Sequence, residues 1–187
     1  MKKLILFFCF AFLAITVKSE QPFFILTMNG LVDKNDNSKN YVVINVSGKS
    51  QKELYDLVNV KLNSFYISSN FTQSKVENKS IQISGVSRTV INTKAFGKII
   101  PTYNLEHVIN LEFRDNMIKF TPLDFRIFGN FSRNSEVYLV NGFLAPNIFH
   151  NNGKVRMLAT KESLENYYNN YVKMIYKAVN DSTEEKW

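Results

Sequence analysis

Apolar and polar positions alternate along several stretches of this chain, which is the period of a β-strand that buries one face. The first clear case runs from Tyr41 to Ser47, where Val42, Ile44 and Val46 occupy every second position. Alternation, or a run rich in β-branched and aromatic residues, predicts further strands over residues 71–77, 80–88, 104–114 and 117–128. The short connections between these strands indicate antiparallel pairing.

Polar breaks separate the predicted strands. Asn78-Lys79 and Asp115-Asn116 are typical of tight turns, because asparagine and aspartate tolerate the backbone conformations that turns need. The apolar phase shifts near Pro122, and we expect a β-bulge there, since proline has no N–H to donate to a neighbouring strand.

Three stretches lack a sustained period. Residues 89–102 mix β-branched residues with a glycine and a proline, and we interpret them as a strand fragment and a loop. Residues 129–153 are irregular, and we expect a long loop there with one extra strand at Val137–Val140. Residues 20–40 start apolar and turn polar, which predicts an N-terminal lead-in strand and loop.

Apolar positions at three- and four-residue steps predict two helices. The first starts at Ser50, which forms a capping box with Glu53, and runs to about residue 66. Its apolar stripe comprises Leu54, Leu57, Val58, Leu62 and Phe65. The second runs from Lys161 to Val179 with Thr160 as the expected N-cap. Its apolar stripe comprises Leu164, Tyr168, Tyr171, Val172, Ile175 and Val179.

The predicted order β-α-β-β-β-β-α indicates an α+β fold, in which an antiparallel sheet of about five strands packs two helices on one face. No internal repeat or interdomain linker is visible in the sequence. We therefore expect residues 41–180 to form a single α+β domain and residues 181–187 to form a flexible tail.

The first nineteen residues have the pattern of a secretory signal peptide. Lys2 and Lys3 precede an uncharged apolar run from Leu4 to Val17, and we expect cleavage after Ser19. The run is shorter than the roughly 20 residues that a membrane-spanning helix needs, which favours export over a permanent anchor. Cys9 lies inside the apolar run, which argues against a lipoprotein. We expect a periplasmic or extracellular protein with no membrane span after cleavage.

Removal of residues 1–19 changes the composition in two ways. Cys9 is the one cysteine, so the mature chain has none, which excludes disulfides, thiol nucleophiles and thiolate metal sites. Lys2, Lys3 and Lys18 also leave, so that 20 of the 23 basic residues remain against 16 acidic ones. This small excess of positive charge argues against a nucleic acid partner.

His107 and His150 are the two histidines, and a general base or metal ligand would most naturally be one of them. His107 falls on the apolar face of its predicted strand, which favours a hydrogen-bonded core histidine. His150 lies in a loop rich in asparagine and glycine, where we expect it to be solvated. A hydrolase built on His107 and a carboxylate is a minor alternative.

Asp33, Asn35 and Asn37 have the spacing of the first ligands in a calcium loop. Ser38 and Ile44 stand where such a loop needs its glycine and its bidentate glutamate. We therefore expect no calcium site in this segment.

The remaining polar patterns have structural explanations. Glu106 and Glu112 lie on one face of a predicted strand, where a solvated sheet surface explains them. The last helix interleaves lysines with tyrosines that could stack bases or sugars, but core packing accounts better for Tyr167, Tyr168, Tyr171 and Tyr176. The sequence holds neither a serine elbow nor a glycine-rich phosphate loop, and we predict no catalytic residue, cofactor or metal site.

Two segments carry a family resemblance: Tyr41–Val58, which reads YVVINVSGKSQKELYDLV, and Asn110–Ile127, which reads NLEFRDNMIKFTPLDFRI. They resemble a secreted Bacteroidota family, domain of unknown function 4468, with a TATA-binding-protein-like (TBP-like) fold. Asn116 departs from the glycine expected there, although both residues tolerate positive φ. The resemblance implies a curved antiparallel sheet backed by two helices. It does not imply DNA binding, because the fold name records shape.

Export, a stable core and the lack of a catalytic constellation favour a non-catalytic module that binds a protein or an envelope component. We expect the free face of the sheet, or one of its edges, to be the contact surface. The alternative is a carrier of a small apolar ligand, held in a cavity between the curved sheet and the last helix.

Overall fold

The computed structural model describes residues 23–65, 71–130, 135–140 and 145–180, so the predicted signal peptide and tail lie outside the described residues. In chain order the elements are β1 (Phe24–Thr27), β2 (Gly30–Asp33), β3 (Val42–Asn45), α1 (Gln51–Phe65), β4 (Phe71–Val76), β5 (Ser80–Ala95), β6 (Lys98–Arg114), β7 (Met117–Gly129), β8 (Glu136–Val137) and α2 (Leu158–Asn180).

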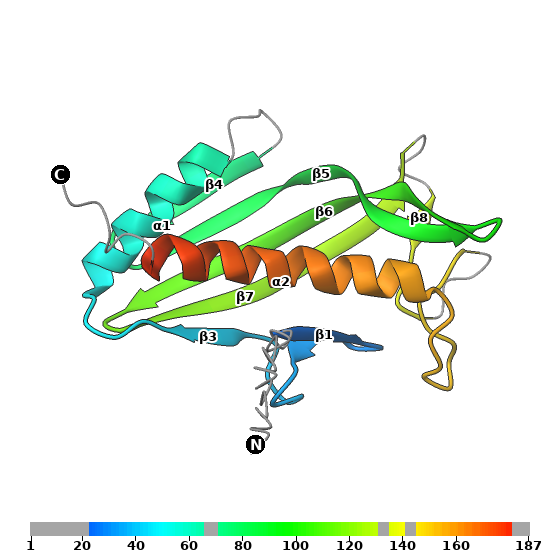
Figure 1. Ribbon diagram of the computed structural model, residues 1–187, viewed down its shortest axis with the longest axis horizontal. Helices are drawn as coiled ribbons and strands as arrows, with labels where there is room; N and C mark the ends of the chain where they lie inside the picture. Colours follow the sequence, from blue (N-terminus) through cyan, green and yellow to red (C-terminus); the bar gives the residue numbers. More distant parts are fainter. Residues whose placement is uncertain (1–22, 66–70, 131–134, 141–144, 181–187) are drawn as a thin grey trace, which may run out of the picture.

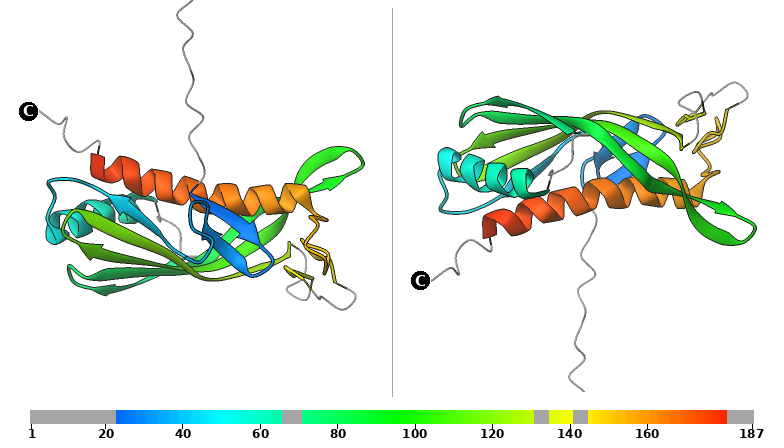
Figure 2. Two further views of the ribbon diagram at one scale, coloured as in Figure 1. Left: turned by 90° about the horizontal axis from the view of Figure 1, so that it is seen from below. Right: turned by 90° about the horizontal axis from the view of Figure 1, so that it is seen from above.

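The main sheet is antiparallel, with the strand order β3-β7-β6-β5-β4, and β8 pairs with the C-terminal end of β7. β1 and β2 form a separate two-stranded sheet. Both helices lie on one face of the curved main sheet (Figure 1, Figure 2). The predicted α+β fold is therefore confirmed. The main sheet has six strands where about five were expected, and the extra strand predicted at Val137–Val140 is the shorter β8.

The core lies between the helices and the face of the sheet that they cover. On β6 every second residue points into it, as the alternating pattern predicted. These residues are Leu105, His107, Ile109, Leu111 and Phe113. The helices contribute Leu54, Val58 and Leu62 from α1, and Leu164, Tyr168, Val172 and Ile175 from α2.

The start of α1 is the predicted capping box. The Ser50 N–H donates to Glu53 Oε2 at 2.7 Å, and the Glu53 N–H donates to Ser50 Oγ at 3.3 Å. The β6–β7 turn adds a third bond, because Asp115 Oδ1 accepts the Gln51 N–H at 2.7 Å. The turn and the first turn of the helix therefore fix one another.

Two predicted turns and the predicted bulge are confirmed. Asn78 and Asn116 take φ values of 57° and 64°, in the left-handed region that asparagine tolerates. Near Pro122 the register between β6 and β7 shifts by one residue, so that Leu123 is the extra residue of a bulge.

The lead-in segment is a hairpin of β1 and β2 that one side chain ties to α2. Asn169 Oδ1 accepts the N–H groups of Phe23 and Phe24 at 2.9 and 2.8 Å, and Asn169 Nδ2 donates to the Phe24 carbonyl at 3.1 Å. Phe24 also packs on Phe120, with ring centroids 5.7 Å apart. The hairpin therefore joins the same core as the main sheet.

The expectation of a strand fragment and loop over residues 89–102 is wrong. β5 and β6 continue as paired strands to a two-residue turn at Phe96-Gly97, with Ala95 opposite Lys98. Beyond the buried Ile91, backbone hydrogen bonds extend this hairpin without a buried face, so the apolar alternation that marks a strand is missing from residues 92–102.

The pairing of β5 with β6 has two irregularities in register within the stretch that was expected to be a loop. Thr89 takes a φ of 56°, and its N–H leaves the ladder to donate to Asn104 Oδ1 at 3.0 Å. A second shift places Pro101 opposite Asn92. Proline is tolerated at such a position because the ladder there is already interrupted.

The second predicted helix, Lys161–Val179, begins earlier than expected. α2 starts at Leu158, so Thr160 lies inside it and is not its N-cap. The Thr160 hydroxyl donates instead to the Asn92 carbonyl at 2.8 Å. A tertiary contact with β5 therefore uses the side chain that the sequence pattern assigned to capping.

Candidate functional site at the tip of the β5–β6 hairpin

His107 lies in the core. Its side chain is 1% exposed and packs among the rings of Phe71, Tyr167 and Tyr171. Burial lowers the pKa of His107 to about 4, so the imidazole is neutral at pH 7. Glu106, its neighbour in sequence, points to the opposite face of β6 and contacts a different set of residues.

Tyr167 links His107 to β5. Its hydroxyl lies 2.8 Å from Ser87 Oγ and 3.3 Å from His107 Nδ1. Burial raises the pKa of Tyr167 to about 12, which keeps this hydroxyl protonated. The serine contacts the phenol and not the imidazole, so the arrangement lacks the direct contact by which a base activates a nucleophile. Among the other singled-out residues, Tyr168 and Tyr171 are buried, whereas Tyr176 and His150 are exposed.

The segment that resembles a calcium loop is occupied by local contacts. Of the predicted ligands Asp33, Asn35 and Asn37, the first two bond each other: Asp33 Oδ1 accepts the Asn35 N–H at 2.7 Å. Asp36 lies 2.8 Å from Lys39 Nζ, and hydrogen bonds from Lys39 first and Ser38 second lower the pKa of this carboxyl to about 2. Within the described ranges, no group of three or more His, Cys, Asp or Glu residues is placed to hold a metal ion.

Charged side chains on the open face of the sheet pair with one another. Arg126 Nε lies 3.0 Å from Glu136 and 3.7 Å from Glu106, and Lys119 Nζ lies 3.2 Å from Glu112. Glu106 and Glu112 therefore each have a basic neighbour of their own. This face is a solvated surface of ion pairs.

A pocket of about 500 Å³ lies beside the sheet, where the β1–β2 turn, the β7 bulge and β8 meet. Apolar residues such as Pro122 and Phe125 share its lining with the charged Asp124, Arg126 and Glu136. No residue of α2 lines it. The pocket therefore differs in place from the sheet–helix cavity that the sequence suggested.

The β5–β6 hairpin extends past the body of the molecule as an arm, residues 92–102, at the end where α2 begins (Figure 1). Phe96, in the turn, is fully exposed, and Ile99 and Ile100 are 63% and 42% exposed. Adjacent residues of a strand point to opposite faces, so both faces of the arm are open.

Phe96 is an unfavourable residue for the backbone conformation of the turn at the tip of the arm. Phe96 and Gly97 have φ values of 50° and 78°. Two-residue hairpin turns with both residues at positive φ strongly favour Asn-Gly, and a bulky residue in the first position is strained. Full exposure gives the Phe96 ring no burial to offset this strain. Local stability therefore does not account for phenylalanine at this position.

The arm is also basic. Lys94 and Lys98 flank the turn, Arg88 precedes the arm, and residues 89–105 contain no aspartate or glutamate. Within the part of the chain that the structure describes, neither lysine has an ion-pair partner. The tip therefore combines exposed apolar groups with uncompensated positive charge.

The base of the arm is fixed to the body. Ile91 is fully buried. The next residue, Asn92, donates its N–H to Ser163 Oγ at 3.1 Å and accepts the Thr160 hydroxyl at 2.8 Å. The first turns of α2 therefore hold the strand from which the arm projects.

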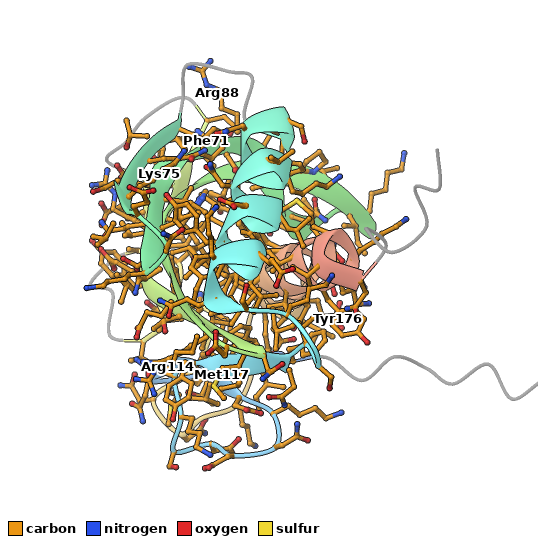
Figure 3. The ribbon with its side chains drawn as sticks, turned by 90° about the vertical axis from the view of Figure 1, so that its left-hand side faces the viewer. Phe71, Lys75, Arg88, Arg114, Met117 and Tyr176 are labelled. Carbon is orange, nitrogen blue, oxygen red and sulfur yellow. The ribbon has the colours of Figure 1, made fainter. Side chains whose placement is uncertain are left out.

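The opposite end of the molecule also has exposed side chains. Figure 3 faces this end, with Lys75 on β4 and with Arg114 and Met117 at the β6–β7 turn. Val76 on β4 and Val60 on α1 are more than half exposed. Neither described helix combines the length and the apolar character that crossing a membrane requires.

Sequence patterns did not reveal the arm, because residues 92–102 have no buried face and therefore lack the apolar alternation of a strand. A usable signal was present in Lys94-Ala95-Phe96-Gly97-Lys98, where an aromatic residue precedes glycine between two lysines. An aromatic residue in a turn that favours asparagine is a reason to look for a binding role.

No protein-family model matches the chain, and no curated protein matches it. Two solved structures are similar to it. A TBP-like protein from Parabacteroides distasonis gives a TM-score of 0.54 at 11% identity, over 75% of this chain and 91% of the other. A DUF4468 family protein from Bacteroides ovatus gives a TM-score of 0.53 at 9% identity, over 75% of this chain and 84% of the other.

These structures confirm the TBP-like fold that the resemblance of Tyr41–Val58 and Asn110–Ile127 implied. At such low identity the likeness concerns the fold, and function has to be argued from the chain's own residues. Neither protein bears the name of an enzyme. With its antiparallel sheet backed by two helices, this chain has the TBP-like fold, in common with a DUF4468 protein.

Proposed function

We propose that the chain is an exported, non-catalytic module that binds a protein or another component of the cell envelope through the tip of its arm. The observation that carries the proposal is Phe96, an exposed aromatic residue in a turn position that favours asparagine. Aromatic residues, phenylalanine included, are enriched in protein–protein interfaces relative to the rest of the surface.

Two further observations support a binding role over a catalytic one. His107, the best candidate for a base, is buried and neutral. Ser87 contacts the Tyr167 hydroxyl and not the imidazole of His107. The base of the arm is fixed to α2 through Asn92, so its tip is presented without a large ordering cost on binding. The proposed place in the envelope depends on the signal-peptide pattern of residues 1–19.

Site-specific crosslinking tests the proposal. A photoreactive diazirine amino acid replaces Phe96 in the chain that lacks residues 1–19, and the protein is irradiated with the envelope fraction of its source cells. The matched control carries the same group at Val76, which is exposed on β4. We expect a discrete protein or lipid adduct at position 96 that is absent at position 76. Equal labelling at both positions, or none at either, contradicts the proposal.

Phe96→Asn separates binding from folding. Asparagine followed by glycine suits this turn, so the variant keeps its thermal stability or gains some, while the exposed ring is lost. We expect it to compete at least tenfold more weakly than the wild type for the adduct formed at position 96. A variant that competes as well as the wild type places the contact elsewhere.

The carrier of a small apolar ligand is the second candidate, favoured by the pocket of about 500 Å³ beside β7 and β8. Asp124, Arg126 and Glu136 in its lining make the pocket less suited to a purely apolar molecule. Native mass spectrometry of the mature chain from its own envelope fraction distinguishes the two. A bound small molecule that survives Phe96→Asn supports the carrier, and a bare chain argues against it.

A further inference from the structure

We infer that the component bound by the arm is a membrane surface rich in anionic lipids, into which the tip inserts Phe96 while Lys94 and Lys98 contact the headgroups. This inference rests on the proposed function and names the partner of the same surface. Its basis is the shape, the apolar content and the charge of the tip.

The shape of the tip suits a soft, flat surface. A two-residue turn projects from the body (Figure 2). Ile99 and Ile100 are exposed on opposite faces of the strand behind it. A projection with an exposed isoleucine on each of its two faces has no single apolar face to place against a protein partner. In a bilayer interface, every side of the tip finds an apolar neighbour.

The order of residues along the tip follows the layers of a membrane interface. Phe96 stands in the turn, and phenylalanine is one of the apolar residues that interfacial segments bury at the boundary between headgroups and acyl chains. Lys94 and Lys98 stand two residues to either side of it, where long stems lie along apolar surface while the ammonium groups reach the headgroups.

The charge of the arm favours anionic over neutral lipids. Residues 89–105 contain two lysines and no acidic residue, and Arg88 comes directly before them. Each basic side chain near an anionic surface strengthens association by about fivefold at physiological salt. The whole mature chain has only a small positive excess, so the arm concentrates the charge where the apolar tip is.

A second segment at the same end of the molecule has the same character. Residues 154–158 read Lys-Val-Arg-Met-Leu, and Val155 and Leu158 are 41% and 57% exposed. The segment leads into α2, whose Thr160 bonds Asn92 at the base of the arm. Stable attachment to a membrane surface generally needs two weak contacts, and this end of the molecule offers both.

Fluorescence with lipid vesicles tests the inference directly. In a chain that lacks residues 1–19 and carries Trp187→Phe, a tryptophan replaces Phe96, or Val76 as the matched control. Vesicles contain phosphatidylcholine and phosphatidylglycerol in equal parts, or phosphatidylcholine alone. We expect a blue shift of the tryptophan at position 96 with the anionic vesicles, weakened by salt, and no shift of the tryptophan at position 76.

Co-sedimentation with the same vesicles measures each contribution. We expect Phe96→Asn to lower the partition coefficient about tenfold or more. The double variant Lys94→Gln, Lys98→Gln should lower it about twentyfold, through the loss of two charges. Its control, Lys61→Gln with Lys75→Gln, removes equal charge from α1 and β4 at the opposite end and should have a much smaller effect.

Three results overturn the inference: no binding of the wild type to anionic vesicles, unchanged binding by Phe96→Asn, or equal losses from the two lysine pairs. If vesicles fail to bind but position 96 crosslinks to a protein, the arm is a protein-binding surface, and the proposed function survives without the membrane. If neither vesicles nor crosslinks give a signal, the proposed function fails as well.

Discussion

The body half of the β5–β6 hairpin and its arm contain similar residues, but only the body half is covered. Ile81 and Ile109 are completely buried in the core, whereas Ile99 and Ile100 are exposed on both faces of the arm. The difference is that α2 extends along the body but not along the arm, because α2 begins at Leu158 and the arm lies beyond that end (Figure 1). Backbone pairing alone thus extends a hairpin, whereas the burial that stabilises the fold is confined to the body.

Replacing isoleucine by alanine at two positions of β6, one in the body and one in the arm, gives the largest expected difference in the free energy of unfolding. Ile109→Ala removes a completely buried side chain and should lower the free energy of unfolding by about 3 kcal/mol, through lost burial and a residual cavity. Ile99→Ala, ten residues earlier in the same strand, should change it by less than about 0.5 kcal/mol. Urea unfolding followed by circular dichroism measures both.

The outcome for Ile99→Ala decides whether the arm is uncovered in solution. A loss comparable to that of Ile109→Ala would mean that a second copy of the chain, or another part of it, packs on the arm. Repeating the measurement at several protein concentrations identifies a second copy, because stability would then depend on concentration.

His107 extends the comparison to charge. The core of the body disfavours a charged imidazole, whereas the arm carries the exposed charges of Lys94 and Lys98. The folded pKa of about 4 lies below the ordinary value of 6.5, so between these values the unfolded chain binds more protons. Stability should therefore fall by as much as about 3 kcal/mol as the pH drops from 6.5 to 4. Urea unfolding across this range should give a smaller slope for His107→Phe, in which Tyr167 keeps its contact with Ser87.

His150→Gln is the control for this measurement, since it removes the other histidine from an exposed position. The difference in slope between the two variants then belongs to the buried imidazole. If His107→Phe has the slope of the wild type, then His107 takes up a proton in the folded state and the body tolerates the charge.

Local sequence patterns predicted the elements whose apolar faces are buried. The capping box of Ser50 and Glu53 marked the start of α1, and alternation from Leu105 to Phe113 marked the body half of β6. The positions that these patterns missed depend on distant partners. Asn169 ties the β1–β2 hairpin to α2 across 145 residues of sequence, and no local period reports such a contact.

The candidate site was harder to predict for a related reason. An exposed arm has no face to bury, so residues 89–102 lack the alternation by which strands are found. The histidines and carboxylates drew attention because their side chains can do chemistry, but His107 is in the core and Glu106 is paired with Arg126. What distinguishes Phe96 is a mismatch between residue and backbone. The Phe-Gly pair between two lysines signals it in the sequence, and the φ values establish it.

The smallest effect is expected at the base of the arm, where Thr160 and Ser163 of α2 bond the backbone of Asn92. We call this contact the clamp. Thr160→Val keeps the shape of the side chain but removes the hydroxyl that donates to the Asn92 carbonyl, at a cost of about 1 kcal/mol. Hydrogen exchange should then be faster at the arm amides from Thr93 to Lys98, while the amides around Ile109 keep their protection.

Thr102→Val is the matched control, because the Thr102 hydroxyl donates at 3.1 Å to the Ile100 carbonyl within the exposed arm itself. This variant should leave exchange unchanged on both sides of the clamp. If Thr160→Val accelerates exchange in the arm alone, the hairpin consists of two units that meet at Asn92, one stabilised by burial and one by its own backbone. If it accelerates exchange equally in both halves, the hairpin opens as one unit, and α2 stabilises the arm as much as the body.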